Sequence, residues 1–144
     1  MKKLKTRKDF AAKTNSIYAA ITQNMPTSDH EEARRFFLQS TTTRISILYI
    51  MSNFFDHKHI TASDVYTKLT PLYGSKSSIV NFLTLGHKKG YFLYEQCGKD
   101  KRKKYLFPSN EFVKIWCAFI SRSEGAPIDK SVNWEEVCSR HKTS

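Results

Sequence analysis

The sequence predicts a single mainly helical domain that carries one small β-hairpin. Several segments repeat apolar residues at helical spacing, and Ser or Thr stands where these helices should begin. Apolar and aromatic residues at 91–94 and 105–107 flank a polar turn that contains glycine, which is the pattern of a hairpin. The 144 residues suffice for one core, and no linker or internal repeat divides them.

Two of the expected helices are defined by their apolar residues. The first spans residues 9–24, where Phe10, Ile17 and Ile21 recur at helical spacing. The other, over residues 44–55, is apolar on nearly all sides. Such a helix is usually buried, so we expect it at the centre of the domain.

Two more helices are indicated by capping sequences. Residues 28–31, Ser-Asp-His-Glu, have the form of a capping box and predict a helix that runs to about residue 39. Residues 61–64 give a weaker signal, with Asp where Glu is preferred. A short helix should follow, with Val65 and Leu69 facing inward.

A turn and a further helix come next. Residues 71–74, Pro-Leu-Tyr-Gly, form the turn because proline cannot continue a helix and glycine has a permissive backbone. Ser75 should cap a helix over 76–88, and Gly90 should stop it.

Two helices are expected after the hairpin. Pro108 ends the hairpin, and Ser109 can cap a helix over 109–122 whose apolar face includes Trp116. A last short helix is expected over residues 133–141.

The charge balance indicates an anionic partner. The chain has 24 Lys and Arg against 13 Asp and Glu, a formal net charge of +11. Such a balance favours nucleic acid, with an anionic membrane surface as the second candidate. Membrane insertion is not expected, because the longest apolar run, 45–51, is far short of the roughly 20 residues that a spanning helix needs.

The N-terminus and the cysteines indicate a cytoplasmic protein. The basic N-terminus is followed by no apolar segment, so it is not a secretory signal. Cys97, Cys117 and Cys138 are odd in number and widely spaced, as expected of reduced thiols rather than disulfides or metal ligands. Residues 1–8 are either a basic arm that adds phosphate contacts or a tail without a specific role.

Residues 76–104 carry the strongest functional signal, because their net charge of +6 exceeds half of the chain's total. The helix expected there has an apolar side and an opposite side that is small, polar and basic. Asn can bind adenine and Lys can bind guanine in a major groove, and the amides after Ser75 can bind a phosphate. The alternative is an ordinary exposed helix face. The outer side contains Ser77, Asn81, Thr84 and Lys88.

The hairpin turn strengthens this interpretation. Four consecutive cations, Lys101 to Lys104, repel one another unless salt or an anion screens them. Such a tip suits phosphates or a minor groove, where Arg102 is the best candidate for insertion. The alternative is a basic edge that only prevents association between strands.

The order helix, short helix, turn, helix and hairpin is that of a winged helix-turn-helix, with residues 44–108 as its central lobe. Residues 60–109 resemble the DNA-binding lobe of MarR-type (multiple-antibiotic-resistance regulator) proteins. The resemblance lies in three features, a serine-rich recognition helix, a helix end over Leu85–Lys89 followed by glycine, and an Asp-x-Arg wing. These correspond to Ser75, Ser77 and Ser78, to Gly90, and to Asp100-Lys101-Arg102.

The resemblance also implies a homodimer formed by the N-terminal residues 1–43 and the C-terminal residues 109–144. A wide apolar arc on the helix after the hairpin favours the same arrangement. The alternative is that helices 9–24 and 28–39 cover this arc within one chain. The residues assigned to the dimer interface are Phe10, Ile17, Ile21, Phe112, Trp116, Phe119 and Ile120.

The sequence therefore predicts a transcription regulator that binds double-stranded DNA in a sequence-specific way as a homodimer. A winged-helix module that binds protein or RNA is the alternative. No enzyme, cofactor or metal motif is present, and His57 and His59 with the adjacent Asp56 are interpreted as a loop between two helices rather than a metal site. No small-molecule effector is evident. The residues assigned to DNA are Ser75, Lys76, Ser77, Ser78, Asn81, Thr84, Lys88, Lys99, Lys101, Arg102, Lys103 and Lys104.

Overall fold

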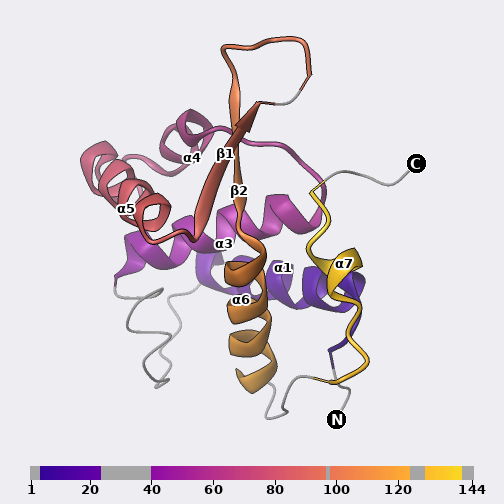
Figure 1. The fold of residues 1–144 in the computed structure, drawn as a ribbon. Helices are drawn as coiled ribbons and strands as arrows, with labels where there is room; N and C mark the ends of the chain where they lie inside the picture. The colour runs from indigo at the N-terminus through magenta and orange to yellow at the C-terminus, as the bar shows by residue number, and fades with distance from the viewer. Residues whose placement is uncertain (1–3, 24–39, 97, 124–128, 141–144) are drawn as a thin grey trace.

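The computed structural model describes residues 4–23, 40–96, 98–123 and 129–140, and these are mainly helical with one two-stranded antiparallel hairpin (Figure 1). The expected helix over 28–39 lies outside the described residues. No helix in the described part of the chain is long and apolar enough to cross a membrane. The elements are α1 (Arg7–Gln23), α3 (Thr41–Phe55), α4 (Ala62–Leu69), α5 (Lys76–Lys88), β1 (Phe92–Gln96), β2 (Lys104–Pro108), α6 (Asn110–Ser123) and α7 (Trp134–Val137).

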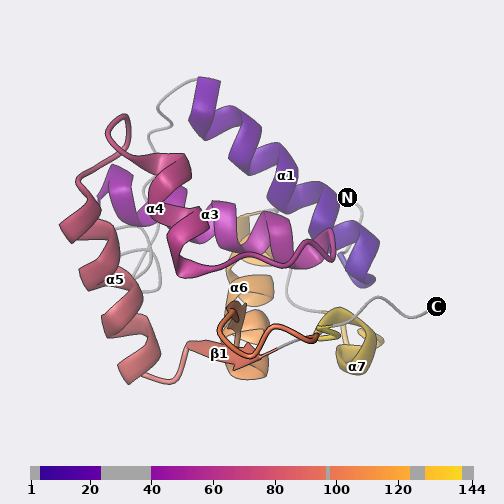
Figure 2. The same cartoon turned by 90° about the horizontal axis from the view of Figure 1, so that it is seen from above.

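Helix α3 is the central element, as its composition predicted. It begins at a capping box in which Ser40 and Thr43 bond each other's backbone amides. Eight of its fifteen side chains are buried. Helix α1 packs along α3, α6 runs beneath the hairpin, and α5 and α7 lie on opposite sides of the hairpin (Figure 2).

Helices α4 and α5 begin at the predicted caps. Thr61 and Asp64 form a complete capping box, and Ser75 accepts a hydrogen bond from the Ser78 amide at 3.1 Å. The turn between the helices packs tightly on α3, since a Cβ on Gly74 would lie 2.5 Å from Thr42 Oγ1. Gly90 follows the end of α5 with a φ of +80°, the left-handed conformation expected of a glycine stop.

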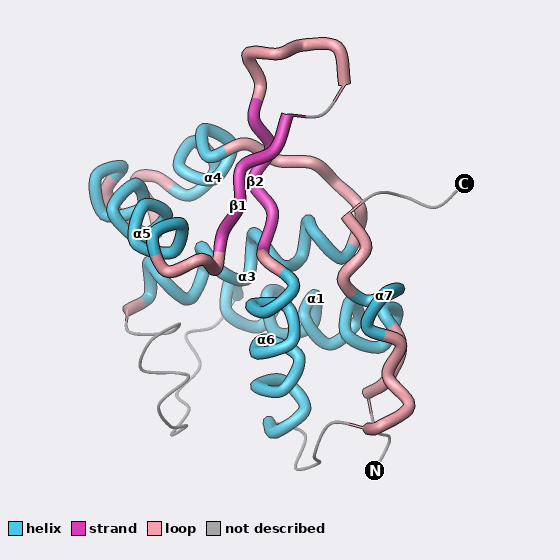
Figure 3. Tube along the Cα trace, in the orientation of Figure 1, coloured by secondary structure: helices cyan, strands magenta, loops and turns pink. Residues whose placement is uncertain are grey.

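The hairpin is anchored at its base on both sides of β2. Strands β1 and β2 pair from Phe92 with Pro108 to Gln96 with Lys104, and the turn projects beyond the helices (Figure 3). On its other side, the Leu106 amide donates to the Ile60 carbonyl at 2.7 Å. The sequence analysis did not predict this bridge, which ties the hairpin to the connection before α4.

Helix α7 is shorter than predicted. Asn133 caps it and it ends at Val137, one turn long, instead of filling residues 133–141. After Val137 the chain bonds the Arg7 guanidinium, which donates to the carbonyls of Glu136 and Val137 at 3.2 and 2.6 Å and to the Ser139 carbonyl at 2.9 Å.

Arg7 fits neither of the two interpretations offered for residues 1–8, a basic arm that adds phosphate contacts or a tail without a specific role. Only 7% of its surface is exposed. Besides the α7 carbonyls it donates to the carbonyls of Phe54 and Phe55 at the end of α3. Burial lowers the pKa of its guanidinium, and the negative charge of Glu136 partly opposes this effect. Arg7 therefore joins α1, α3 and α7 and does not serve as a phosphate contact.

The side chains predicted to face a second chain are largely covered by their own chain. Trp116 donates its indole N–H to Thr14 at 3.1 Å, and Phe10 stacks on Trp134 with ring centroids 6.4 Å apart. The wide apolar arc of α6 is thus explained without a partner, and the homodimer stays a prediction. Phe10, Phe112, Trp116 and Ile120 are 0–1% exposed, Ile17 and Phe119 are half-buried, and the side chain of Ile21 is outside the described part.

The two described cysteines are buried free thiols. Burial raises the pKa of Cys117 and of Cys138, which keeps both thiols protonated and poorly reactive. Cys97 lies outside the described residues.

Candidate nucleic-acid interface

Helix α5 has the two faces that its sequence predicted. Ile79, Leu83 and Gly86 are buried, and Phe82 is half-buried. The helix and the hairpin turn together expose every residue assigned to DNA, although contact with DNA itself stays a prediction. Exposed residues are Ser75, Lys76, Ser77, Ser78, Asn81, Thr84 and Lys88 on the helix and its cap, and Lys99, Lys101, Arg102, Lys103 and Lys104 on the hairpin.

The N-terminal end of α5 combines a capped backbone with a positioned cation. The Ser75 hydroxyl bonds both the amide and the hydroxyl of Ser78. Helix geometry leaves the amides of Lys76 and Ser77 at the open end, where the helix dipole is positive. The Lys76 ammonium lies 4.8 Å from the ring centroid of Tyr66, so a cation–π contact restrains it against α4.

The C-terminal half of α5 is fixed against β1 by close contact. Gly86 has no room for a side chain, because a Cβ there would lie 2.2 Å from the ring of Phe92. The Tyr91 amide donates to the Gly86 carbonyl at 2.8 Å, and His87 Nδ1 donates to the Phe92 carbonyl at 3.0 Å. Helix and hairpin therefore behave as one unit, in which the exposed face of α5 keeps a fixed relation to the hairpin.

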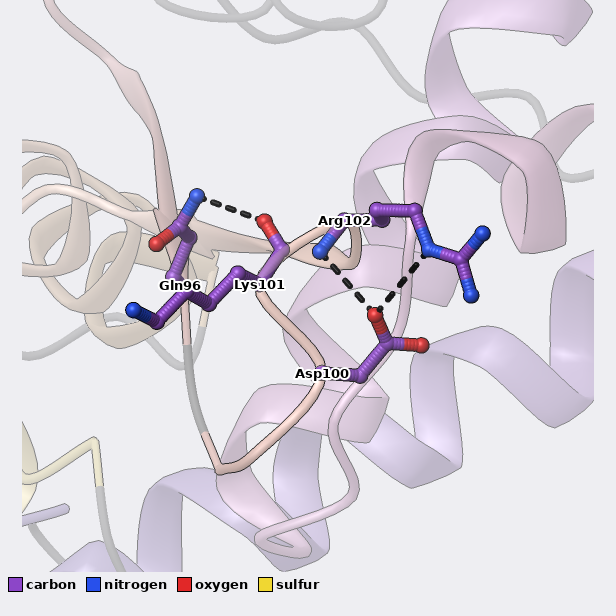
Figure 4. A network of polar contacts seen from close by, with 4 residues as sticks. All are labelled: Gln96, Asp100, Lys101 and Arg102. Atoms are coloured by element: carbon purple, nitrogen blue, oxygen red, sulfur yellow. Dashed lines mark hydrogen bonds and ion pairs between the residues drawn. The ribbon is translucent and has the colours of Figure 1, made fainter.

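The hairpin turn is organised by its own polar groups (Figure 4). Asp100 accepts from the Arg102 amide at 3.0 Å, and Gln96 donates to the Lys101 carbonyl at 2.7 Å. The Arg102 side chain is 95% exposed, with its Nε 3.7 Å from the Asp100 carboxylate. The contacts drawn from Asp100 go to the backbone N–H and to Nε of Arg102, so its two terminal nitrogens take no part in them and remain available to an anion outside the protein.

Both carboxylates of residues 76–104 face an arginine, so neither is left to repel an anion. Asp100 faces Arg102, and Glu95 on β1 forms an ion pair with Arg140 from the segment after α7. Arg140 was missed by the sequence analysis, because it lies 45 residues from Glu95 and no local pattern marks it. It adds a further positive charge beside the hairpin.

Val80 and Leu85 are two further exposed residues of α5 to which the sequence analysis gave no role. They are 37% and 46% exposed although both are apolar. Their positions on the helical period were the available signal, since neither falls on the side of Ile79 and Leu83.

A hollow of about 470 Å³ lies beside Arg7 and α7, but its polar groups support the fold. Arg7 bonds backbone carbonyls, Glu136 accepts from the Arg7 amide at 3.2 Å, and Asn133 caps α7. Among the residues whose structure is described, no three His, Cys, Asp or Glu side chains cluster as metal ligands would.

No family model matches the chain, and comparisons with curated proteins and with solved structures found no match. Function must therefore be inferred from the chemistry and geometry of the site.

Proposed function

We propose that the chain is a cytoplasmic winged-helix protein that binds double-stranded DNA and regulates transcription as a homodimer. The observation that supports this best is the fixed pairing of a polar, basic helix face with a basic hairpin. Contact between Gly86 and Phe92 holds the two together. A rigid pair of this kind can engage a groove and its flanking phosphates at the same time.

Helix α5 is the element proposed to enter the major groove. Its exposed Asn81 offers a donor and an acceptor to adenine, and Lys88 offers donors to guanine. Ser77 and Thr84 are small enough to let the helix approach the base edges. Lys76 and the first amides of the helix suit a phosphate at the groove wall.

The hairpin is the element proposed to contact the minor groove or its phosphates. Arg102 is the residue best suited to insertion, because its side chain is 95% exposed on a turn that Asp100 organises. Lys101, Lys103 and Lys104 supply charge next to it, and all are exposed. Neutralising phosphates with these cations releases counterions, so the affinity should fall steeply with salt.

The homodimer in this proposal derives from the MarR-type resemblance. With the wide arc of α6 covered by its own chain, the half-buried Ile17 and Phe119 are the predicted interface residues that keep exposed surface. A symmetric dimer would bind a roughly palindromic site, with half-sites about one DNA turn apart.

Selection from a random duplex pool at about 150 mM salt tests the proposal, because this salt screens weak unspecific contacts. We expect enrichment of one inverted repeat. Recovery of bound DNA without an enriched sequence would contradict sequence-specific regulation and would indicate nonspecific DNA binding. No recovery would contradict DNA binding, and the same selection with RNA would then test the alternative partner.

A matched pair of variants tests the role of α5. Asn81→Ala should weaken the base preference at one position of the enriched site. The difference in binding free energy between the preferred base and the others should fall there by about 1–3 kcal/mol. Asn110→Ala makes the same change at an exposed residue of α6 and should leave the site unchanged. Identical enriched sites for Asn81→Ala and the natural chain would remove Asn81 from the proposed contact.

A further inference from the structure

In the described part of the chain, the large exposed apolar side chains lie in the turn between α4 and α5 and on α5 itself. They are Leu72 in the turn, 83% exposed, and Val80 and Leu85 on α5, 37% and 46% exposed. An isolated exposed apolar residue is ordinary on a protein surface. Val80 and Leu85 differ because they share the exposed side of α5 with the polar groups proposed to read DNA.

These two side chains border the polar band of α5 on its two sides. At about 100° per residue, Val80 and Leu85 are separated by about 140° around the helix axis. All four outer polar residues fall within that arc, in the angular order Thr84, Ser77, Lys88 and Asn81. The outer face is therefore a polar strip with one apolar side chain at each margin.

An apolar group next to a major-groove contact has one natural counterpart. The edges of the bases in that groove present hydrogen-bond donors and acceptors, and thymine alone adds a methyl group. Residues 76–104 carry a net charge of +6, which favours a polyanion such as DNA as the partner of α5. The apolar residues at its margins would then meet the edges of bases.

We propose that Val80 and Leu85 each contact the 5-methyl group of a thymine, and that this selects A·T base pairs at both margins of the α5 contact. The inference rests on the proposed DNA binding and specifies what the site reads. The two residues are about 7.5 Å apart along the α5 axis and lie on its two margins, so the two thymines belong to different base pairs.

Replacing thymine by deoxyuridine tests this contact, because the replacement removes the methyl group and keeps the base pairing. Each thymine of the enriched site is replaced in turn, and the affinity is measured at constant salt. We expect the affinity to fall by about fourfold at two positions in each half-site. This is the effect of no longer burying one apolar carbon on binding. Other thymines should show no loss.

Three variants assign the losses to residues. Val80→Ala should abolish the uracil effect at one position, and Leu85→Ala should abolish it at the other. Both residues are exposed and alanine favours helix, so the variants should fold as the natural chain does. Leu72→Ala is the matched control, because it truncates an exposed leucine outside the helix face and should keep both effects.

The possible outcomes separate this inference from the proposed function. Tight, sequence-specific binding without any uracil effect would overturn thymine reading and leave DNA binding intact. Uracil effects that persist in both alanine variants, or that disappear in Leu72→Ala, would also overturn the assignment. Absence of any DNA binding would contradict the proposed function, and thymine reading would fall with it.

Discussion

Three arginines show how differently one residue type is used in this molecule. Arg7 is 7% exposed and donates to backbone carbonyls of α3 and α7. Arg102 is 95% exposed at the hairpin tip, where its side chain faces Asp100. Arg140 lies between these extremes, with 26% of its side chain exposed, in an ion pair with Glu95.

The comparison explains why the net charge alone does not locate a binding surface. A buried guanidinium whose donors are taken by carbonyls contributes to the fold and has no donors left within reach of a partner. An exposed guanidinium on a short turn contributes little to stability and keeps its donors for a ligand. Variants at these arginines should therefore separate stability from binding.

The largest effect is expected for Arg7→Ala. The substitution removes the donors of several buried carbonyls at the ends of α3 and α7. We expect the free energy of unfolding to fall by about 3–5 kcal/mol, measured by denaturant titration. DNA affinity per folded molecule should be unchanged.

The exposed neighbour Lys8 provides the control, because Lys8→Ala should stay within about 0.5 kcal/mol of the natural chain. Equal stability of the Arg7→Ala and Lys8→Ala variants would contradict the role of Arg7 in joining α1, α3 and α7.

The contact between α5 and the hairpin is tested by Gly86→Ala. The added methyl group would meet the buried ring of Phe92, so the helix and the strand must move apart. We expect a loss of about 1–3 kcal/mol in stability, together with weaker DNA binding. Phe92→Leu in the same chain should restore part of both losses, and additive losses in the double variant would argue against direct contact.

The local elements were predictable because their signals lie within a few residues. The serines and threonines at 61, 75 and 109 cap the helices that they were expected to cap. The aromatic and apolar residues on both sides of a polar turn that contains glycine predicted the hairpin. The exposed face of α5 followed from its helical period.

The remaining features depend on contacts between distant residues, which no local pattern encodes. The bridge of Ile60 to Leu106, the ion pair of Glu95 with Arg140 and the burial of Arg7 each join separate segments. The apolar arc of α6 looked like an interface because its cover, α1, lies a hundred residues earlier in the chain. The sequence pattern of an apolar helix face is the same whether the chain itself or a second copy of it covers that face.

A smaller effect on stability and a specific effect on binding are expected for Arg102→Ala. Its side chain is almost fully exposed, so thermal unfolding should stay the same. DNA affinity should fall at least tenfold. The slope of log affinity against log salt concentration should become shallower by about one, because about one counterion fewer is released on binding. Lys130→Ala removes one charge from an exposed position before α7 and is the control. Equal affinities of the two variants would contradict the role of the hairpin.

The smallest effect is expected for the ion pair between Arg140 and Glu95. Both side chains are partly exposed, so solvent screens their attraction. A double-mutant cycle with Arg140→Ala and Glu95→Ala should give a coupling of about 0.2–1 kcal/mol that decreases with added salt. A coupling independent of salt would show that packing of the arginine stem, and not charge, joins the two segments.

The hairpin tip also has a consequence for how this surface can change over evolutionary time. Residues 98–103 are exposed, and the hydrogen bonds described for the tip join residues 96–103 to one another. The anchoring contacts, from Ile60 to Leu106 and from Gly86 to Phe92, lie at the base. Insertions, deletions and charge changes at the tip should therefore leave the fold intact. Natural variation, or an engineer, can retune the reach and charge of this loop independently of the core.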